Sequence, residues 1–332
     1  MPSMLSMLAG QRAAFRRDGT PTLEQRRTDL ARLKAAVLAR RVDIDAALQA
    51  DFGHRSTHET ALMEVMALVQ GINYQRRRLR RWMRPERRHV PLQFQPARAW
   101  VEYQPLGVVG IIAPWNLPFS LALMPLATAL AAGNRVMVKP SELTPASSAL
   151  IAELIGASFD PDQVAVVTGD DQVGRAFAAL PFDHLLFTGS TTVGRAVMKA
   201  ASEHLVPVTL ELGGKSPVII EPGHSPAHAA RAIAYGKLAN AGQVCIAPDY
   251  VLIQERDLDG FLQAYDQAAR AMYPDGPAAD AYTAIINARH HARLVDLLDD
   301  ARAHGATVRE VGVDAGSARQ RARTLAPAVV LG

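Results

Sequence analysis

The sequence predicts an α/β protein, with a doubly wound parallel sheet followed by a second α/β unit. Hydrophobic residues make up 49% of the 332 residues and charged residues 20%, a balance that is typical of a packed globular chain. From about residue 100, short β-branched runs alternate with helical segments, and this alternation favours a parallel sheet. The pattern ends in a Gly-rich turn after Leu212. We therefore expect a first domain over residues 1–210 and a second over residues 211–332.

The expected elements follow from hydrophobic periodicity. Before residue 90 the chain is expected to be helical, and Leu23–Ala50 and Glu59–Trp82 carry apolar residues at helical spacing. The predicted strands are short apolar runs, namely Gly107–Ala113, Arg135–Val138, Gln163–Val167, His184–Phe187, Val206–Glu211 and Pro217–Ile220. The helices expected between the strands are Leu121–Ala132, Pro145–Ala157, Val173–Ala179 and Val193–Ser202.

Composition excludes several classes of protein. A single cysteine excludes a disulfide framework and a Cys-rich zinc site, so no metal is predicted. The net charge of +4 owes much to the run Arg76–Arg88. We interpret this run as a solvated or interface helix end that stops at Pro85, rather than as a nucleic-acid patch. Nucleic-acid binding through this run is the less favoured alternative.

No targeting or membrane segment is predicted. The N-terminus has no basic residue before its first apolar stretch, unlike a secretory signal. Tyr103–Asn134 carries no charge, but Pro105, Pro114, Pro118 and Pro125 interrupt it. A buried strand, a loop and a buried helix fit this segment better than a membrane span. We expect a soluble, cytoplasmic protein without a membrane partner.

A glycine turn follows the predicted strand at His184–Phe187. Gly189 and Gly194 have the spacing of the outer glycines in the dinucleotide-binding fingerprint, whereas Thr191 occupies the position of the middle glycine. Such a turn, with Ser190 and Val193 inside it, opens a helix whose N-terminal N–H groups attract anions. A tight turn without a ligand is the alternative.

The segment Val138–Glu142 places charged side chains at the end of a strand. Glu142 can accept hydrogen bonds from ribose hydroxyls, with Lys139 beside it. Lys139 would tolerate a 2′-phosphate and Glu142 would oppose one, so the pair leaves NAD and NADP open. In the competing interpretation Ser141 only caps the helix that begins near Pro145.

The segment Leu210–Pro217 contains Gly-Lys-Ser, as a phosphate-binding loop does. That motif requires glycine where Thr209 stands, so we reject a nucleoside triphosphatase. Glu211 lies between Leu210 and Leu212, and we expect it to be partly buried. Burial would raise the pKa of this carboxyl group toward the range that suits a general base. A structural glutamate that binds backbone N–H groups is the competing interpretation.

Two further residues are candidates for catalysis. Cys245 lies among small residues near a helix start, where backbone N–H groups can stabilise a thiolate. Taken alone, it is also compatible with a buried, inert thiol. Asn116 stands between two prolines, and its fixed amide could donate a hydrogen bond to a developing oxyanion. Its alternative role is to cap the following helix.

Together these segments resemble one known family. PWNLPF, KPSE, FTGSTTVG, LELGGKSP and GQVCIAPDY, in this order, are similar to the signature motifs of the aldehyde dehydrogenase superfamily. The resemblance runs from about residue 20 to the last residue. GQVCIAPDY and the segment before the first strand are most similar to the class 3 branch, which includes coniferyl aldehyde dehydrogenases. In this family the middle glycine is normally absent, in agreement with Thr191.

The resemblance implies a Rossmann-like cofactor domain, a catalytic domain and a role for each motif residue. Cys245 would attack an aldehyde as thiolate, and the Asn116 amide and the Cys245 N–H would hold the oxyanion. Glu211 would activate the water that hydrolyses the thioester to the acid. Lys139, Ser141, Glu142 and the turn with Gly189, Ser190, Val193 and Gly194 match the positions that bind NAD or NADP. The implied substrate is an aromatic aldehyde such as coniferyl aldehyde, or a medium- to long-chain aliphatic one.

The resemblance also implies an incomplete second domain. The family's Glu-Ile-Phe-Gly-Pro segment is missing, so we expect a C-terminally truncated chain that is poorly soluble and nearly inactive alone. A homodimer is expected at full length. A truncated relative that binds nucleotide without turnover is the alternative function. A relative that transfers the acyl group to coenzyme A is less favoured, because Glu211 is present.

Overall fold

The computed structural model describes residues 3–313 and 321–332. The chain forms two compact units. The first consists of Met1–Ile44 and Leu62–Glu211, and the second of Asp45–Ala61 and Leu212–Gly332. The first unit thus ends at Glu211, and a short N-terminal segment is grouped with the second unit.

A five-stranded sheet forms the centre of the first unit. Its strands are β3 (Val108–Ile112), β4 (Arg135–Lys139), β5 (Val164–Val166), β6 (His184–Gly189) and β7 (Val208–Leu212). The strand order is β5-β4-β3-β6-β7, and the pairs β3–β4, β3–β6 and β4–β5 are parallel. The predicted parallel sheet is therefore confirmed. The order reverses between β3 and β6, and in such sheets ligands bind beyond the carboxyl ends of the strands at that point.

The connecting helices begin at well-defined caps. They are α6 (Pro118–Ala132), α7 (Pro145–Ser158), α8 (Asp171–Ala178) and α9 (Thr191–Ser202). α6 and α7 start with a proline in their first turn, whereas the side chains of Asp170 and Ser190 cap α8 and α9. The structure confirms the four helices; three start two or three residues before the predicted position, because their first turns are polar or proline-rich. β3 and α6 account for the uncharged segment that was predicted as a buried strand and helix.

The N-terminal helices differ from the expectation in two places. They are α1 (Met4–Asp18), α2 (Leu23–Ala39), α3 (Arg41–Phe52), α4 (Thr57–Glu59), the π-helix η1 (Thr60–Met66) and α5 (Ala67–Trp82). The predicted single helix Leu23–Ala50 is wrong, because Arg40 leaves helical geometry between α2 and α3 (φ −105°, ψ 18°). Its guanidinium there binds Asp43 and Glu153. The second predicted helix begins with a short α-helical turn and the π-helix.

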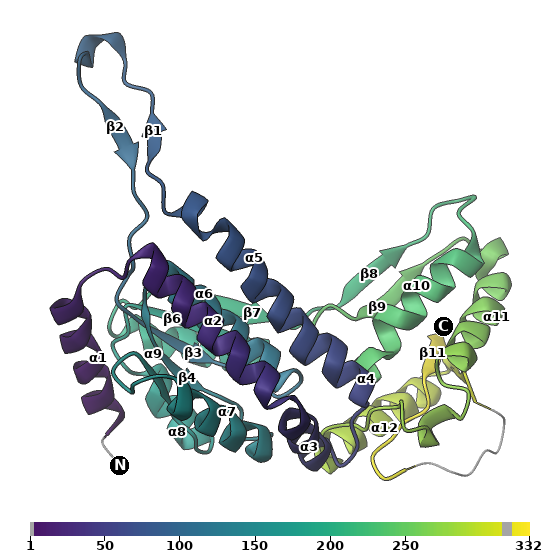
Figure 1. Cartoon of the computed structure of the whole chain (residues 1–332). Coiled ribbons are helices and arrows are strands. Elements are labelled where there is room, and N and C mark those ends of the chain that lie inside the picture. Colours follow the sequence, from purple (N-terminus) through teal and green to yellow (C-terminus); the bar gives the residue numbers. More distant parts are fainter. Residues whose placement is uncertain (1–2, 314–320) are drawn as a thin grey trace. The chain divides into compact units, whose positions relative to one another are not determined.

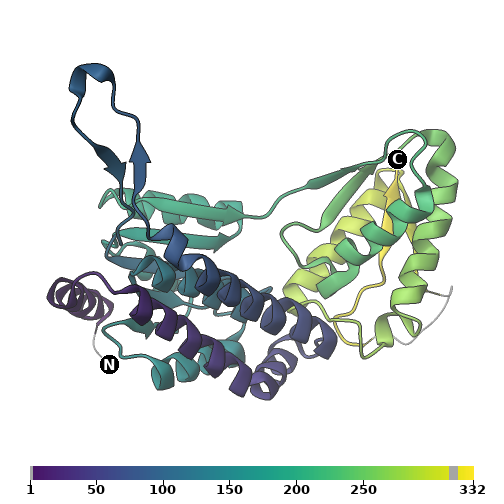
Figure 2. The ribbon, with the colours of Figure 1, turned by 45° about the horizontal axis from the view of Figure 1, so that its top comes forward.

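A two-stranded hairpin follows α5 and corrects the expectation that residues up to 90 are all helical. β1 (Glu86–Arg88) pairs antiparallel with β2 (Ala99–Val101), and a 3₁₀ turn (Leu92–Phe94) lies between them. Figures 1 and 2 both show this hairpin projecting from the first unit. Its strands are three residues long and mostly exposed, so they carry no hydrophobic periodicity that a sequence pattern could reveal.

The second unit is also built of helices and strands. β8 (Ser216–Ile219) and β9 (Pro248–Leu252) pair in parallel, and α10 (Pro226–Leu238) connects them through the 3₁₀ turn η3 (Ala239–Gly242). The remaining elements are α11 (Glu255–Met272), η4 (Gly276–Ala278), α12 (Ala288–Ala303) and the antiparallel pair β10 (Thr307–Glu310) and β11 (Ala328–Leu331). Apolar side chains of α10 and α11 form the core of this unit, among them Ala230, Ile233 and Phe261.

Within the described part of the chain, no helix has both the length and the apolar composition needed to cross a membrane.

Candidate active site

The predicted site residues of the first unit gather at one edge of its sheet. Lys139 ends β4, Gly189 ends β6, and Asn116 lies in the loop after β3. β3 pairs in parallel with both β4 and β6, so these three positions follow strand ends that lie side by side. Glu211 lies near the end of β7, which is hydrogen-bonded to β6. This is the edge at which doubly wound sheets bind their ligands.

Lys139 and Glu142 form an ion pair at this edge. Lys139 is 2% exposed, and its ammonium group donates to the Glu142 carboxylate. Burial raises the pKa of Glu142, but the hydrogen bonds and the positive charge of Lys139 outweigh it, and the pKa lies below its ordinary value. Ser141 accepts a hydrogen bond from the Leu143 N–H at its Oγ (3.2 Å). A buried lysine needs such a partner, so the pair fixes a charged group at the strand end.

The turn into α9 provides backbone donors at the same edge. Ser190 Oγ accepts from the Val193 N–H (3.3 Å), and the buried Gly194 lies in the first turn of the helix. Gly189 lies tightly against Phe187, because a Cβ at Gly189 would be 2.5 Å from the Phe187 ring. Val193 is 49% exposed and places an apolar surface beside the helix start. A helix start after a strand, next to an apolar side chain, fits a phosphate-bearing ligand.

Glu211 is exposed, so the expectation that it is partly buried is wrong. Side chains alternate along β7: Leu210 and Leu212 are half-buried, whereas Thr209 and Glu211 point to the exposed side. In a strand, adjacent side chains face opposite ways, so apolar neighbours do not bury the residue between them. Glu211 at this edge is accessible to a water molecule, and its catalytic role stays a prediction.

Asn116 lies in the short loop between β3 and α6 and is half-buried. The N-cap position of α6 belongs to Leu117, whose side chain makes no capping hydrogen bond. Instead, the α6 N-terminus receives a carboxylate from another helix: Glu64 Oε2 accepts from the Ser120 N–H (2.6 Å). The sequence did not reveal this contact, which joins residues 56 positions apart.

Cys245 lies on an unusual turn of the second unit. Asn240, Ala241 and Gly242 all have positive φ (53°, 51° and 75°). The chain then turns back, with the Ala247 N–H donating to Val244 O (3.0 Å). Cys245 is exposed, so the alternative of a buried, inert thiol is wrong. In the part of the chain that the structure describes, the Cys245 N–H donates to no acceptor, and it is available to bind an oxyanion.

A network of polar side chains that the sequence did not reveal supports this turn. Glu59 Oε1 accepts from the Asn240 N–H (2.8 Å), and Gln243 Nε2 donates to Asn240 O (3.0 Å). Glu59 and Asn240 are 181 residues apart, so no local pattern could connect them.

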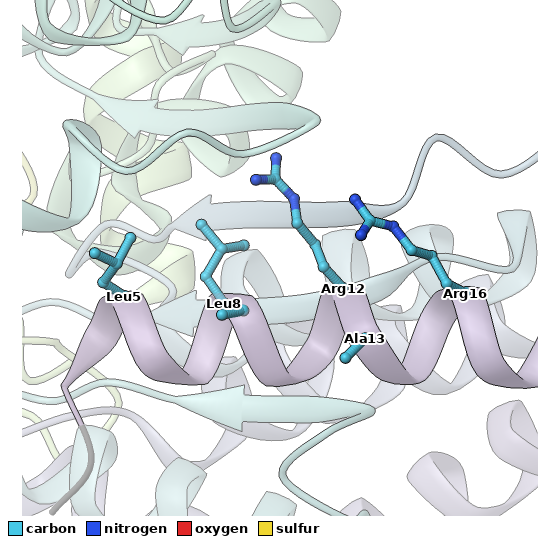
Figure 3. A pocket seen from close by; sticks show the side chains of 6 residues that line it. Leu5, Leu8, Arg12, Ala13 and Arg16 are labelled. Atoms are coloured by element: carbon cyan, nitrogen blue, oxygen red, sulfur yellow. The ribbon is translucent and has the colours of Figure 1, made fainter.

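One hollow of the first unit does not belong to the site. A hollow along α1 is lined by Leu5, Leu8, Ala9, Arg12, Ala13 and Arg16 (Figure 3). Arg12 donates to Asp183, whose carboxylate also binds the Val108 N–H at the start of β3. The hollow therefore lies near the amino ends of the strands, away from the candidate site. Among the described residues, no group of His, Cys, Asp and Glu could hold a metal ion.

The fold and the site define a class of protein: a doubly wound α/β unit with polar side chains at its ligand-binding edge, joined to a unit that presents an exposed cysteine. The chain belongs to the aldehyde dehydrogenase family, whose model matches residues 6–332.

Two relatives illustrate the similarity in sequence. The chain is 50% identical over 303 residues to a "Probable coniferyl aldehyde dehydrogenase" of Pseudomonas aeruginosa, covering 91% of this chain and 64% of that protein. It is 35% identical over 309 residues to the "Aldehyde dehydrogenase, dimeric NADP-preferring" of Canis lupus familiaris, with 92% and 68% covered. The chain thus spans about two thirds of the length of these curated relatives, and slightly less in the first case.

Two solved structures illustrate the similarity in fold. The substrate-bound AldH of Staphylococcus aureus superimposes with a TM-score of 0.89 at 35% identity, covering 98% of this chain and 70% of that one. An aldehyde dehydrogenase of Mycobacterium tuberculosis, solved in complex with NAD⁺, has a TM-score of 0.81 at 28% identity, with 93% and 64% covered. These similarities confirm the predicted α/β fold.

Proposed function

We propose that the protein oxidises an aldehyde to the carboxylic acid with NAD⁺ or NADP⁺, through a thiohemiacetal and a thioester on Cys245. The observation that carries the proposal is the exposed thiol of Cys245 on a defined turn, with its own N–H available. Membership of the aldehyde dehydrogenase family supports the same chemistry. In this proposal, residues 1–210 bind the cofactor and residues 211–332 form the catalytic domain.

The residues at the carboxyl edge of the sheet fit a dinucleotide. Glu142 can accept hydrogen bonds from ribose hydroxyls, and Lys139 fixes its orientation. The start of α9, with Gly189, Ser190, Val193 and Gly194, would hold the phosphates through backbone N–H groups. When bound there, the nicotinamide cofactor supplies the acceptor for the two electrons removed from the aldehyde. One relative is named as NADP-preferring and one similar structure was solved with NAD⁺, so the proposal includes both cofactors.

Each step of the reaction is assigned to particular residues of this chain. The Cys245 sulfur forms a bond to the aldehyde carbon, and the carbonyl oxygen becomes an oxyanion. The Asn116 amide and the Cys245 N–H donate to that oxyanion; one such donor typically lowers the barrier by about 3–4 kcal/mol. After oxidation, Glu211 takes a proton from a water molecule that attacks the thioester carbon, and the carbon–sulfur bond breaks to release the acid and the thiol.

Substrate, assembly and location complete the proposal. Two relatives that share 50% and 48% identity with the chain are named for coniferyl aldehyde, which favours an aromatic aldehyde, with medium- to long-chain aldehydes next. A homodimer is proposed because the β1–β2 hairpin exposes Leu92 (86%), Phe94 (68%) and Trp100 (57%), a patch that a second copy could cover. We propose a cytoplasmic protein with no nucleic-acid or membrane partner.

Burst and steady-state kinetics, with aldehyde in excess over protein, test the reaction. With an aromatic aldehyde and NAD⁺ or NADP⁺, the full-length protein should form reduced cofactor and acid continuously, whereas its Cys245→Ser variant should form neither; the 332 residues alone should be nearly inactive. Glu211→Gln should give one equivalent of reduced cofactor and then stall, because the thioester is no longer hydrolysed. Intact mass spectrometry should find that acyl group on Cys245.

Three results would count against the proposal. Nucleotide binding without modification of Cys245 by an aldehyde or another electrophile would favour the non-catalytic alternative. Steady turnover by Glu211→Gln would show that another group activates water. Faster release of the acyl group to coenzyme A than to water would indicate an acyl-transferring enzyme.

A further inference from the structure

A carboxylate far away in sequence holds the turn that precedes Cys245. Glu59 lies at the end of α4, next to the π-helix, and belongs to the same compact unit as Cys245. Its Oε1 accepts from the Asn240 N–H (2.8 Å) and from the Tyr273 hydroxyl (3.3 Å). Its Oε2 accepts from the Thr283 hydroxyl (2.5 Å). Three donors from different parts of the unit thus converge on one side chain.

The donors of this network are themselves fixed. Burial, and then the negative charge of Glu59, raise the pKa of Tyr273, so its hydroxyl keeps the proton that it donates. Tyr273 is 6% exposed and also reaches Leu238 O (3.3 Å), at the end of α10. Thr283 is 1% exposed and accepts from the Ser56 N–H (3.1 Å). Glu59 therefore has little freedom to move away from Asn240.

The turn needs such support because its backbone is strained. A left-handed conformation costs an L-residue about 1–2 kcal/mol. Asparagine tolerates it, but Ala241 (φ 51°) has no side chain that could compensate. Strained residues of this kind persist only where the surroundings fix them. The bond from Asn240 N–H to Glu59 fixes the first of the three left-handed residues.

Gln243 fixes the other end of the turn. Its Nε2 donates to Asn240 O and to Ala284 O (both 3.0 Å), and its Oε1 accepts from the Ile286 N–H (3.0 Å). The Gln243 side chain thereby connects the turn to the segment 284–286. Two residues later the chain reaches Cys245, so the direction of the Cys245 N–H and Sγ depends on this turn.

We propose that Glu59 is a positioning residue for Cys245: together with Gln243 it holds the left-handed turn Asn240–Gly242, and through it orients the Cys245 backbone N–H that binds the oxyanion. The inference rests on the proposed role of Cys245 as the nucleophile. Glu59 acts only through the turn and does not touch the substrate.

The test compares two reactions of the same thiol in the whole chain, without cofactor. Alkylation by iodoacetamide needs an accessible thiolate but forms no oxyanion. Acylation by p-nitrophenyl acetate needs the same thiolate and also passes through a tetrahedral oxyanion. The variants are Glu59→Ala, Glu59→Gln and Gln243→Ala. Tyr282→Phe is the matched control, because it keeps the ring that packs against Tyr273 and removes only a hydrogen bond to Leu325 O (2.7 Å), which is not part of the Glu59 network. Thermal unfolding is measured for all of them.

We expect Glu59→Ala and Gln243→Ala to lower the acylation rate about tenfold or more relative to the alkylation rate, since one oxyanion donor is typically worth about 10²–10³ in rate. Glu59→Gln keeps an oxygen that can accept from the Asn240 N–H and should restore the ratio to within about threefold of wild type. Tyr282→Phe should lower the unfolding temperature without changing the ratio. If Glu59→Ala does not fold, Gln243→Ala carries the same test.

Each other outcome has a defined meaning. If the ratio is unchanged in the folded Glu59 and Gln243 variants, or changes equally in Tyr282→Phe, the positioning role is refuted. If wild-type Cys245 reacts with neither reagent, the proposed nucleophile itself is wrong, whatever Glu59 does. The failure of the inference and the failure of the proposed function are therefore distinguishable.

Discussion

The buried Lys139 and the carboxylate of Glu142, three residues later, form an ion pair at the carboxyl end of β4. The Lys139 side chain is 3% exposed and that of Glu142 is 40% exposed. The Lys139 ammonium group is thus buried, and the Glu142 carboxylate is the more exposed member of the pair. In the proposed function Glu142 would be the group that a ribose meets first, and it would bear on the choice between NAD and NADP.

Replacing Glu142 should shift that choice. In Glu142→Gln the amide still accepts a hydrogen bond from Lys139, but the negative charge that opposes a 2′-phosphate is gone. We expect the affinity for NADP⁺ relative to NAD⁺ to rise about fivefold, which corresponds to roughly 1 kcal/mol for two charges near 4 Å in water. Calorimetric titration with both nucleotides measures this ratio, and the effect should shrink at high salt.

Glu203→Gln is the control for this experiment, because Glu203 is exposed at the opposite end of α9 from the glycine turn. An unchanged ratio in Glu142→Gln, or an equal change in Glu203→Gln, would contradict the assigned role.

The sheet of the first unit could be predicted because its strands are short, largely apolar runs between helices, and β3, β4 and β5 are mostly buried. β3, for example, is buried along its whole length, so its composition alone marks it. The hairpin β1–β2 could not be predicted for the opposite reason. Its strands are held by pairing with each other rather than by burial, and pairing leaves no hydrophobic pattern in the sequence.

Parts of the candidate site could be predicted where one short segment contains both the residue and the groups that it contacts. Lys139 and Glu142 are of this kind. The sequence predicts the position of Glu211 near a strand end, but it does not predict that Glu211 is exposed. Exposure depends on which side of β7 faces the core. Glu59 could not be found at all, since its partners Asn240, Tyr273 and Thr283 reach it only through the folded chain.

Two asparagines of the first unit should behave differently when replaced by alanine. Asn116 is proposed to donate to the oxyanion, so Asn116→Ala should lower kcat about 10²–10³-fold with little change in unfolding temperature. Asn134 is buried, and its Oδ1 accepts from the N–H groups of Leu106 (2.7 Å) and Gly107 (3.1 Å). Asn134→Ala should leave kcat per folded molecule unchanged and cost about 1–3 kcal/mol of stability.

Steady-state kinetics and denaturant unfolding of both variants decide between these roles. A loss of stability without a loss of kcat in Asn116→Ala would make Asn116 a structural residue.

Two glycines of the first unit provide a matched pair for stability. A Cβ at Gly189 would meet the Phe187 ring at 2.5 Å, whereas a Cβ at Gly156, inside α7, would meet nothing within 4 Å. Gly189→Ala should therefore destabilise the unit by about 1–3 kcal/mol through overpacking. Gly156→Ala should stabilise it by about 0.5–1 kcal/mol, because alanine loses less conformational freedom in a helix.

Urea unfolding of the two variants measures both changes. Equal midpoints for Gly189→Ala and wild type would mean that Phe187 moves aside easily. The close contact would then not be the reason why glycine occupies position 189.

Three tyrosines of the second unit should make its stability fall at alkaline pH. Burial raises the pKa of Tyr265 to about 12, and burial also raises the pKa of Tyr273 and Tyr282, with Glu59 adding to both. In the unfolded chain a tyrosine loses its proton near pH 10. The folded state therefore holds protons that the unfolded state releases, and ionisation favours unfolding above that pH.

The stabilisation is fully present below pH 10 and should decline between about pH 10 and pH 12, by up to about 1.4 kcal/mol per pH unit for each tyrosine that ionises only on unfolding. Urea unfolding across this range, followed together with tyrosinate absorbance, measures the slope. Tyr265→Phe should reduce the slope by about one third, because one of three groups is removed. If the free energy of unfolding stays constant up to pH 12, the tyrosine hydroxyl groups are hydrated in the folded protein. That result would also contradict the buried hydrogen bond from Tyr273 to Glu59.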